Sequence, residues 1–370
     1  MNNRLAENHY TGCLLGGAVG DALGAPVEFM SLDEIRRQHG SQGVSDYCEY
    51  PDHTGEFTDD TQMTLFTAEG LLRAYHRAVL KGIGGATVSI TYQSYIRWLH
   101  TQGLSANAIP DGWGVQDNQK GWLISEKDLF KRRAPGNTCL NSLMSGIPGT
   151  IEKPINNCKG CGGIMRMAPV GLIFNNPESA FDMGCQLAAL THGHPSGYHS
   201  AGAFATIIQQ LASGGNLESA IAYSSVLLCD HRENEETLNE IYRAVELFHQ
   251  TKSGVETGYL NLADLIVKLG KGWVGEEALA ISLFCSLHYE HDFCKGVLAS
   301  VNHSGDSDST GSITGNILGL INGIESIPEK WISNLRSARI VLQVGKDLHT
   351  GYKGDIDEPD EEWWRRYPGY

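Results

Sequence analysis

Apolar residues recur at intervals of three and four positions along most of this chain, the spacing of a helix with one buried face. Gly16, Gly17 and Gly20 interrupt the first such stretch and would let another helix approach closely. Alternating patterns typical of strands are scarce, so the sequence predicts an all-α fold. We expect helices, within a few residues at each end, at 5–23, 59–81, 88–101, 178–191, 198–213, 217–229, 235–251, 275–288, 290–301, 310–324 and 328–348.

Charge and composition exclude several classes of partner. The hydrophobic fraction of 41% is typical of a globular protein with a large core. With 28 basic and 43 acidic residues the net charge is −15, and the longest basic cluster is Lys131–Arg133, so we expect no nucleic-acid partner. No apolar stretch approaches the roughly 20 residues that a membrane span needs, and no secretion signal begins the sequence. We therefore expect a cytoplasmic protein without a membrane partner.

Nine cysteines raise the question of a disulfide framework or a zinc site. The count is odd, and Cys13, Cys185 and Cys285 lie in apolar surroundings where a free thiol behaves as a small hydrophobic group. Cys158 and Cys161 form one C-x-x-C motif, but no second pair follows at zinc-ribbon spacing. Free cysteines are favoured over a structural zinc.

Three polar, glycine-containing segments, at about 30–57, 102–137 and 149–163, are predicted to be long loops, which in compact domains are often functional. Nothing marks a linker between two domains. We predict one domain over residues 1–353 and an acidic, then aromatic tail over 354–370, with its tryptophans packed back onto the domain.

Two short acidic segments each precede an apolar helix. They are GEFTDDTQMT (55–64) and HSGDSDSTGS (303–312). Helix capping is one explanation, because carboxylate and hydroxyl oxygens accept hydrogen bonds from free N–H groups at a helix start. A metal site is the other, because each segment supplies two carboxylates and a hydroxyl, which are ligands for hard cations. The spacing of an EF-hand is absent from both.

Four stretches together resemble the ADP-ribosylglycohydrolase family. They are GCLLGGAVGDALGAPVEF (12–29), EFTDDTQM (56–63), GCGGIMRMAPVGL (160–172) and SGDSDSTGSITGNILG (304–319), with weaker support from APGNTCLNSL (134–143) and LTHGHPSGY (190–198). They occur in the family's order over nearly the whole chain. The resemblance implies a compact orthogonal multi-helix domain with two Mg²⁺ ions on one face.

The resemblance also assigns residues to the metal site and to catalysis. It makes Glu28, Asp59, Asp60 and Asp308 the expected catalytic residues, with Glu28 in a loop that contacts the substrate's ribose. Ser309 stands where threonine is commoner and keeps the hydroxyl oxygen. Asp21 is expected to support the acidic loops. The implied metal ligands are Thr58, Asp59, Asp60, Asp306, Asp308 and Ser309.

The remaining stretches imply a site for the ADP-ribose group. Glycines let backbone N–H groups approach a diphosphate, as expected for Gly160, Gly162 and Gly163. The implied substrate-binding residues are Asn137, Thr138, Gly160, Gly162, Gly163, Met165, His192 and Tyr198.

The implied activity is Mg²⁺-dependent hydrolysis of the bond between ADP-ribose and a protein side chain. Arginine is the expected acceptor, because the 12–29 and 160–172 stretches look closer to the branch of the family that acts on dinitrogen reductase. Two alternatives stay open. One is an immunity protein that occludes an ADP-ribosylating toxin through a surface loop such as 102–133, and the other is hydrolysis of free ADP-ribose esters.

Overall fold

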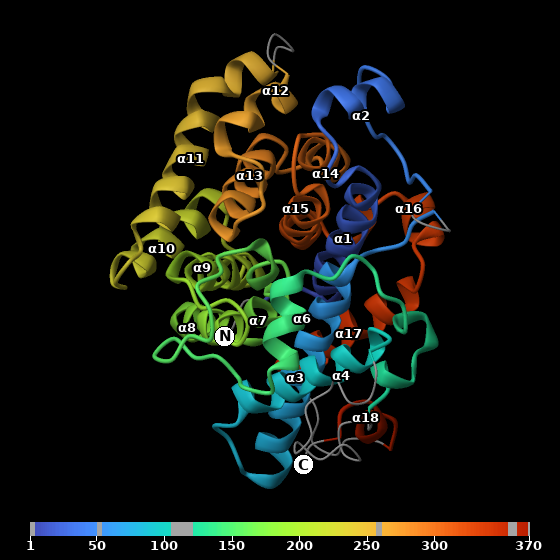
Figure 1. The fold of residues 1–370 in the computed structure, drawn as a ribbon, viewed down its shortest axis with the longest axis vertical. Helices are drawn as coiled ribbons and strands as arrows, with labels where there is room; N and C mark the ends of the chain where they lie inside the picture. Colours follow the sequence, from blue (N-terminus) through green and yellow to red (C-terminus); the bar gives the residue numbers. More distant parts are fainter. Residues whose placement is uncertain (1–3, 50–53, 105–120, 257–260, 354–360, 369–370) are drawn as a thin grey trace.

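The computed structural model is built from α-helices (Figure 1). It describes residues 4–49, 54–104, 121–256, 261–353 and 361–368. Within these ranges extended backbone pairs only at two isolated bridges, and there is no strand. The predicted all-α fold is confirmed. The helices are α1 (Glu7–Gly24), α2 (Leu32–His39), α3 (Asp59–Lys81), α4 (Thr87–Thr101), α6 (Asn137–Met144), α7 (Ala168–Ile173), α8 (Pro177–Ala189), α9 (Pro195–Ala212), α10 (Leu217–Cys229), α11 (Glu235–Glu256), α12 (Leu262–Ile266), α13 (Gly275–His288), α14 (Phe293–Val301), α15 (Ser307–Asn322), α16 (Glu329–Asn334), α17 (Ala338–Lys353) and α18 (Glu361–Arg366).

The apolar periodicity located the long helices well. The predicted ranges 59–81, 217–229 and 275–288 coincide with α3, α10 and α13. One helix predicted over 328–348 is wrong, because the structure has α16 and α17 there. Ser337 lies between them with φ of 61°, a left-handed conformation that cannot continue a right-handed helix.

The predicted loop 30–57 is wrong in part, because it contains α2. This helix begins with a capping box in which Ser31 accepts from the Glu34 N–H and the Glu34 carboxylate accepts from the Ser31 N–H. That S-x-x-E signal was present in the sequence. Residues 105–120 of the second predicted loop lie outside the described residues, and α6 begins at its end. The third ends in a 3₁₀ turn, η5 (Cys161–Gly163).

The centre of the fold is an antiparallel contact between α1 and α15 (Figure 1). Glycines on α1 recur every four residues against the backbone of α15. A Cβ added at Gly16 would lie 2.2 Å from the Gly315 carbonyl oxygen, and one at Gly20 would lie 2.0 Å from that of Gly311. Only glycine permits so close an approach. The predicted close approach to the first helix is therefore confirmed, and α15 is the partner.

This contact decides where the acidic segments lie. The C-terminal end of α1 reaches the N-terminal end of α15, where a Cβ at Gly24 would lie 2.2 Å from the Ser307 carbonyl oxygen. Glu28 follows α1 after one 3₁₀ turn, η1 (Ala25–Val27), and Asp306 caps α15. Two segments from opposite ends of the sequence thus meet.

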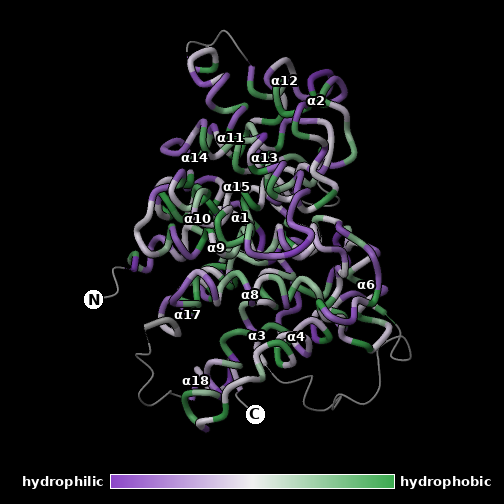
Figure 2. The backbone as a smooth tube through the Cα atoms, turned by 90° about the vertical axis from the view of Figure 1, so that its left-hand side faces the viewer, coloured by the Kyte–Doolittle hydropathy of each residue, from purple (hydrophilic) through white to green (hydrophobic). Residues whose placement is uncertain are grey.

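The other helices surround this pair, with α11 and α13 toward the upper left of Figure 1 and α3 and α4 toward the bottom. Along most helices the hydropathy alternates between hydrophobic and hydrophilic (Figure 2), as expected for helices with one buried face. Among the described residues no single helix is long and apolar enough to span a membrane. One pair, Glu7–Val27 with Leu32–His39, meets that test only jointly and is bent by 92°.

The C-terminal helix α18 packs against α3 and α17. Trp363 is buried, the ring centroids of Trp364 and His76 lie 4.3 Å apart, and the Tyr367 hydroxyl donates to Asp347 at 2.8 Å. The tryptophans therefore pack back as expected. The domain boundary after residue 353 stays a prediction.

Candidate active site

Helix capping explains one side chain in each acidic segment. The Thr58 hydroxyl caps α3 by accepting from the Asp60 N–H, and the Asp306 carboxylate caps α15 by accepting from the Ser309 N–H. The carboxylates of Asp59 and Asp60 are not needed for these caps, yet both are buried. Capping therefore occurs in both segments but does not explain the burial of the Asp59 and Asp60 carboxylates.

The two segments meet in three dimensions. The Ser309 hydroxyl donates to the Asp60 carboxylate at 2.9 Å. One carboxylate oxygen from each of Glu28, Asp306 and Asp308 lies within 4.8 Å of the others. We call the five carboxylates of Glu28, Asp59, Asp60, Asp306 and Asp308 the acidic centre.

The electrostatics of the acidic centre are unfavourable in isolation. Burial raises the pKa of all five carboxyl groups, and for all but Asp308 repulsion from neighbouring carboxylates adds to it, bringing the pKa of Glu28 to about 10. None of the ion pairs between described residues involves these five. Buried negative charge without a basic partner and with mainly oxygen donors fits a hard divalent cation.

Asp21 on α1 holds the start of α3 in place. Its carboxylate accepts from the N–H of Thr58 at 2.8 Å and from the N–H and hydroxyl of Thr61 at 3.0 and 2.5 Å. Burial first, and then the charge of Asp308, raise the pKa of Asp21 to about 7 against the effect of these hydrogen bonds. Asp21 therefore supports the acidic loops, as expected.

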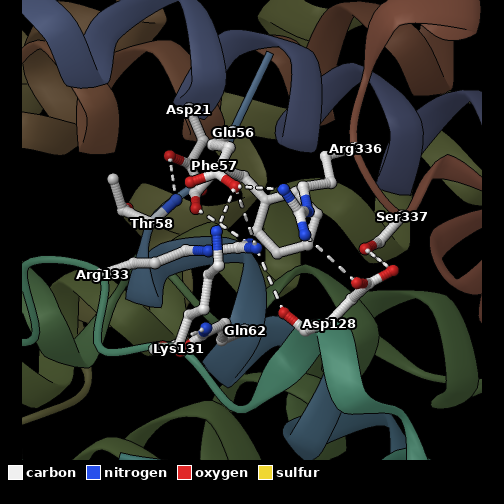
Figure 3. A network of polar contacts seen from close by, with 10 residues as sticks. All are labelled: Asp21, Glu56, Phe57, Thr58, Gln62, Asp128, Lys131, Arg133, Arg336 and Ser337. Carbon is white, nitrogen blue, oxygen red and sulfur yellow. Dashed lines mark hydrogen bonds and ion pairs between the residues drawn. The ribbon is translucent and has the colours of Figure 1, made fainter. Parts of the chain in front are cut away.

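A network of basic residues surrounds the neighbouring Glu56 (Figure 3). The Glu56 carboxylate lies 3.0 Å from Lys131 Nζ, 3.0 Å from Arg336 Nη1 and 3.7 Å from Arg133 Nη2. The Arg133 guanidinium also donates to the Phe57 carbonyl at 3.3 Å, and the Arg133 carbonyl accepts from the Asp59 N–H at 3.0 Å. This network fixes the segment that carries Asp59. Sequence reasoning missed it, although Lys131–Arg133 is the longest basic cluster.

The glycine-rich turn lies beside the acidic centre. The Cys161 thiol donates to the Asp306 carboxylate at 2.8 Å, so Cys161 is more than the loop residue that the sequence suggested. A Cβ at Gly162 would lie 3.0 Å from both Cys139 Sγ and the His192 ring, which explains the glycine. Gly160 and Gly162 keep some exposed surface, and Gly163 is buried.

His192 is buried against this turn. Its Nδ1 lies 2.8 Å from the Thr191 hydroxyl, and burial first, then the charge of Arg166, lower its pKa to about 3. The imidazole is therefore neutral at physiological pH. Arg166, which sequence reasoning did not single out, donates to the Thr191 hydroxyl at 2.6 Å and lies over the ring of Tyr95.

The other expected substrate-binding residues fall into two groups. Asn137 and Thr138 begin α6 with accessible surface, directly after Gly136, whose N–H donates to Asp59 at 3.3 Å. Met165 and Tyr198 are buried, at 3% and 8% exposure. Direct contacts of all these residues with a ligand stay predictions.

A third segment, Lys271–Gly275, joins the acidic centre to the glycine-rich turn. The Lys271 carbonyl accepts from the Asp306 N–H at 2.8 Å, and the Trp273 carbonyl accepts from the Cys161 N–H at 3.2 Å. The Gly275 N–H donates to the Lys159 carbonyl at 2.8 Å. We call this segment the crosspiece. Sequence reasoning missed it, because its role rests on backbone bonds that leave no side-chain signature.

Known proteins are similar to this chain over nearly its whole length. A family model described as ADP-ribosylglycohydrolase matches residues 2–357. The ADP-ribosyl-[dinitrogen reductase] glycohydrolase of Rhodospirillum rubrum is 24% identical over 90% of this chain and 92% of its own length. The ADP-ribosylarginine hydrolase Tri1 of Serratia proteamaculans is 23% identical over 91% of this chain and 78% of its own. A solved structure titled ADP-ribosylglycohydrolase-related protein complex superposes with a TM-score of 0.62 at 20% identity, covering 94% of this chain and 98% of that one, which shows a shared fold.

Proposed function

This chain belongs to the ADP-ribosylglycohydrolase family, whose members hydrolyse ADP-ribose from proteins, and we propose that its own acceptor is arginine and its cofactor Mg²⁺. The observation that carries the proposal is the acidic centre. Its Glu28, Asp306 and Asp308 carboxylates lie within 4.8 Å of one another, and none of its five buried or half-buried carboxylates has a basic partner among the described residues. Cations from outside the chain would offset the negative charge of such a cluster. The proposal includes a cytoplasmic location.

Six side chains would hold the cations. Divalent cations bound there would supply positive charge to polarise water and the ribose hydroxyls. The caps and the Asp21 hydrogen bonds fix the two segments before any cation binds, which lowers the cost of ordering the ligands. The proposed ligands are Thr58, Asp59, Asp60, Asp306, Asp308 and Ser309.

Glu28 is the candidate general base. It is the only carboxylate of the acidic centre that is half-buried rather than buried, so it faces the side from which substrate and water arrive. Cations bound beside Glu28 would favour its ionised form. In the proposed reaction, water attacks C1″ of the ribose and its proton passes to the Glu28 carboxylate. The bond from C1″ to the guanidinium nitrogen breaks, and the released arginine takes up a proton.

The glycine-rich turn is the candidate diphosphate site. Gly160 and Gly162 carry no side chain between the backbone and an approaching oxyanion. The crosspiece holds this turn to the acidic centre. The ADP and ribose parts of one ligand would therefore be held by segments that are directly bonded to each other.

Arginine is proposed as the acceptor because Tri1, which matches over most of this chain, is named an ADP-ribosylarginine hydrolase. The test uses two substrates in parallel, one protein ADP-ribosylated on arginine and one on serine, each with Mg²⁺ or with EDTA. We expect release of free ADP-ribose from the arginine substrate only, and none in EDTA. Release from serine alone would overturn the acceptor. Tight binding of an ADP-ribosylating toxin without turnover of either substrate would favour occlusion, and turnover of only a small ADP-ribose ester would favour that alternative.

A further inference from the structure

Phe29, directly after Glu28, has an unusual backbone and an unusual exposure. Its φ is 70°, a left-handed conformation that is rare for a bulky side chain. Its side chain is 74% exposed, the largest value among the exposed large hydrophobic residues. A residue that is strained and also poorly buried needs a compensating contact.

That contact is a stack on Trp273. The two ring centroids lie 5.1 Å apart with an angle of 21° between the ring planes, the offset-stacked geometry that aromatic pairs favour. Trp273 is the middle residue of the crosspiece, whose backbone bonds reach the acidic centre at Lys271 and the glycine-rich turn at Trp273. The Phe29 ring therefore packs on a segment that backbone hydrogen bonds hold at two points.

Glu28 itself has no comparable support. Within the described part of the chain its side chain makes no hydrogen bond and no ion pair, and one of its carboxyl oxygens lies within 4.8 Å of oxygens of Asp306 and Asp308. Glu28 lies in the turn that follows η1. The backbone bonds of the turn, from Glu28 N–H to the Gly24 carbonyl and from Met30 N–H to the Val27 carbonyl, tie it only to its own helix end.

We propose that the Phe29–Trp273 stack is a clasp that positions the Glu28 carboxyl group beside the other four carboxylates of the acidic centre. Phe29 is then a positioning residue and contacts no reacting atom. The inference rests on the proposed function for the catalytic role of Glu28, but the clasp itself is a conformational property that can be measured without substrate.

The first test measures conformation. Amide hydrogen exchange of residues 27–31 is compared in the metal-free wild type and in Phe29→Ala, Trp273→Ala and the double variant. An aromatic pair corresponds to a few-fold to about tenfold change in an equilibrium. We expect each single variant to speed exchange by about 3- to 10-fold and the double variant to add little. Unchanged exchange in both single variants would overturn the clasp, whatever the enzyme does.

The second test measures turnover. We expect Phe29→Ala to lower kcat about 3- to 10-fold with KM within twofold, and Phe29→Tyr, which keeps the ring, to restore it. Tyr242→Ala, which removes a half-exposed ring on α11, should change neither constant.

The decisive comparison places Phe29→Ala in a Glu28→Gln background. Since the clasp acts through Glu28, adding Phe29→Ala to Glu28→Gln should not lower kcat further. A full additional loss would mean that the ring contacts the substrate, and the clasp would be wrong. If Glu28→Gln alone leaves turnover unchanged, the proposed base fails, while the exchange measurement still decides on the clasp.

Discussion

Glu56 and Asp60 stand four positions apart in the sequence, and both are buried, but their surroundings are opposite. Glu56 lies within 4 Å of three basic side chains. Asp60 has none among the ion pairs of the described residues, and its nearest charges are other carboxylates. The same chain therefore buries negative charge in two ways. The charge of Glu56 is offset by basic side chains of the protein, whereas the charge of the acidic centre would be offset by bound cations.

A second paired carboxylate, Glu69, lies on the same helix as Asp60. Its side chain is 0% exposed and accepts from Arg97 at 2.9 Å and from Ser94 at 2.7 Å. Removing one member of such a pair leaves a buried charge unpaired, whereas removing one carboxylate of the acidic centre relieves repulsion. The paired sites should therefore govern stability, and the acidic centre should govern activity.

The largest effect should come from Asp308→Ala. The loss of a cation ligand is expected to lower turnover at least about a thousandfold, roughly 4 kcal/mol in the barrier. The metal-free variant should unfold no more easily than metal-free wild type. Burial raises the pKa of Asp308, so its ionised form at neutral pH lowers the free energy of unfolding. Steady-state kinetics and urea denaturation measure both, and a variant that keeps more than a tenth of the wild-type rate would contradict the metal role.

Glu69→Gln should show the reverse pattern. We expect the free energy of unfolding to fall by about 3 kcal/mol, because Arg97 stays buried without its counter-charge. Turnover per folded molecule should stay within about twofold. Glu235→Gln, at an exposed position of α11, is the matched control and should change stability by less than about 0.5 kcal/mol. Equal stability of Glu69→Gln and Glu235→Gln would contradict the expectation that the paired carboxylates govern stability.

Glu28→Gln should affect only the chemical step. The amide keeps the shape of the carboxylate but cannot accept the proton from water, so kcat should fall about a hundredfold, or roughly 2.7 kcal/mol. Binding of ADP-ribose, measured by calorimetry, should stay within an order of magnitude of wild type. Unchanged turnover would make Glu28 a surface residue.

Removal of the cations should destabilise the protein by less than Glu69→Gln does. EDTA is expected to stop hydrolysis and to lower the free energy of unfolding by about 1.4 kcal/mol, relative to protein with Mg²⁺ at tenfold excess over Kd. Added Mg²⁺ should reverse both changes. In EDTA the free energy of unfolding of Glu69→Gln should fall by the same amount as that of the wild type, since Glu69 lies outside the acidic centre. Full activity after verified metal removal would contradict the metal role of the acidic centre.

The sequence was most informative where a signal is local. Periodicity located α3, α10 and α13 to the residue, and carboxylates at helix starts marked both acidic segments. Gly16 and Gly20 indicated a close helix contact. The matching period of Gly311, Gly315 and Gly319 was also visible, and the two sets could have been paired from their common spacing of four.

The sequence could not show contacts that depend on the arrangement of distant segments. The Glu56 network joins Glu56 to Arg336, and the clasp joins Phe29 to Trp273. Neither pair shares a periodic pattern, and an aromatic residue in a loop has many possible partners. The capping box of Ser31 and Glu34 is a local signal for α2. The polar composition around it led instead to the prediction of a loop.

The glycine contact between α1 and α15 also has a consequence for how the protein is made. The Asn316 side chain donates to the Cys13 carbonyl, and these residues lie 303 positions apart. A ribosome that adds about 5–20 residues per second needs roughly 15 to 60 s to deliver α15 after α1. During that time α1, which is buried from Tyr10 to Gly24 in the finished fold, has no groove to occupy. The nascent chain therefore carries this apolar segment without its packing partner through most of its synthesis, and exposed apolar segments are targets for chaperones. It acquires its acidic centre only when nearly all of it has been translated.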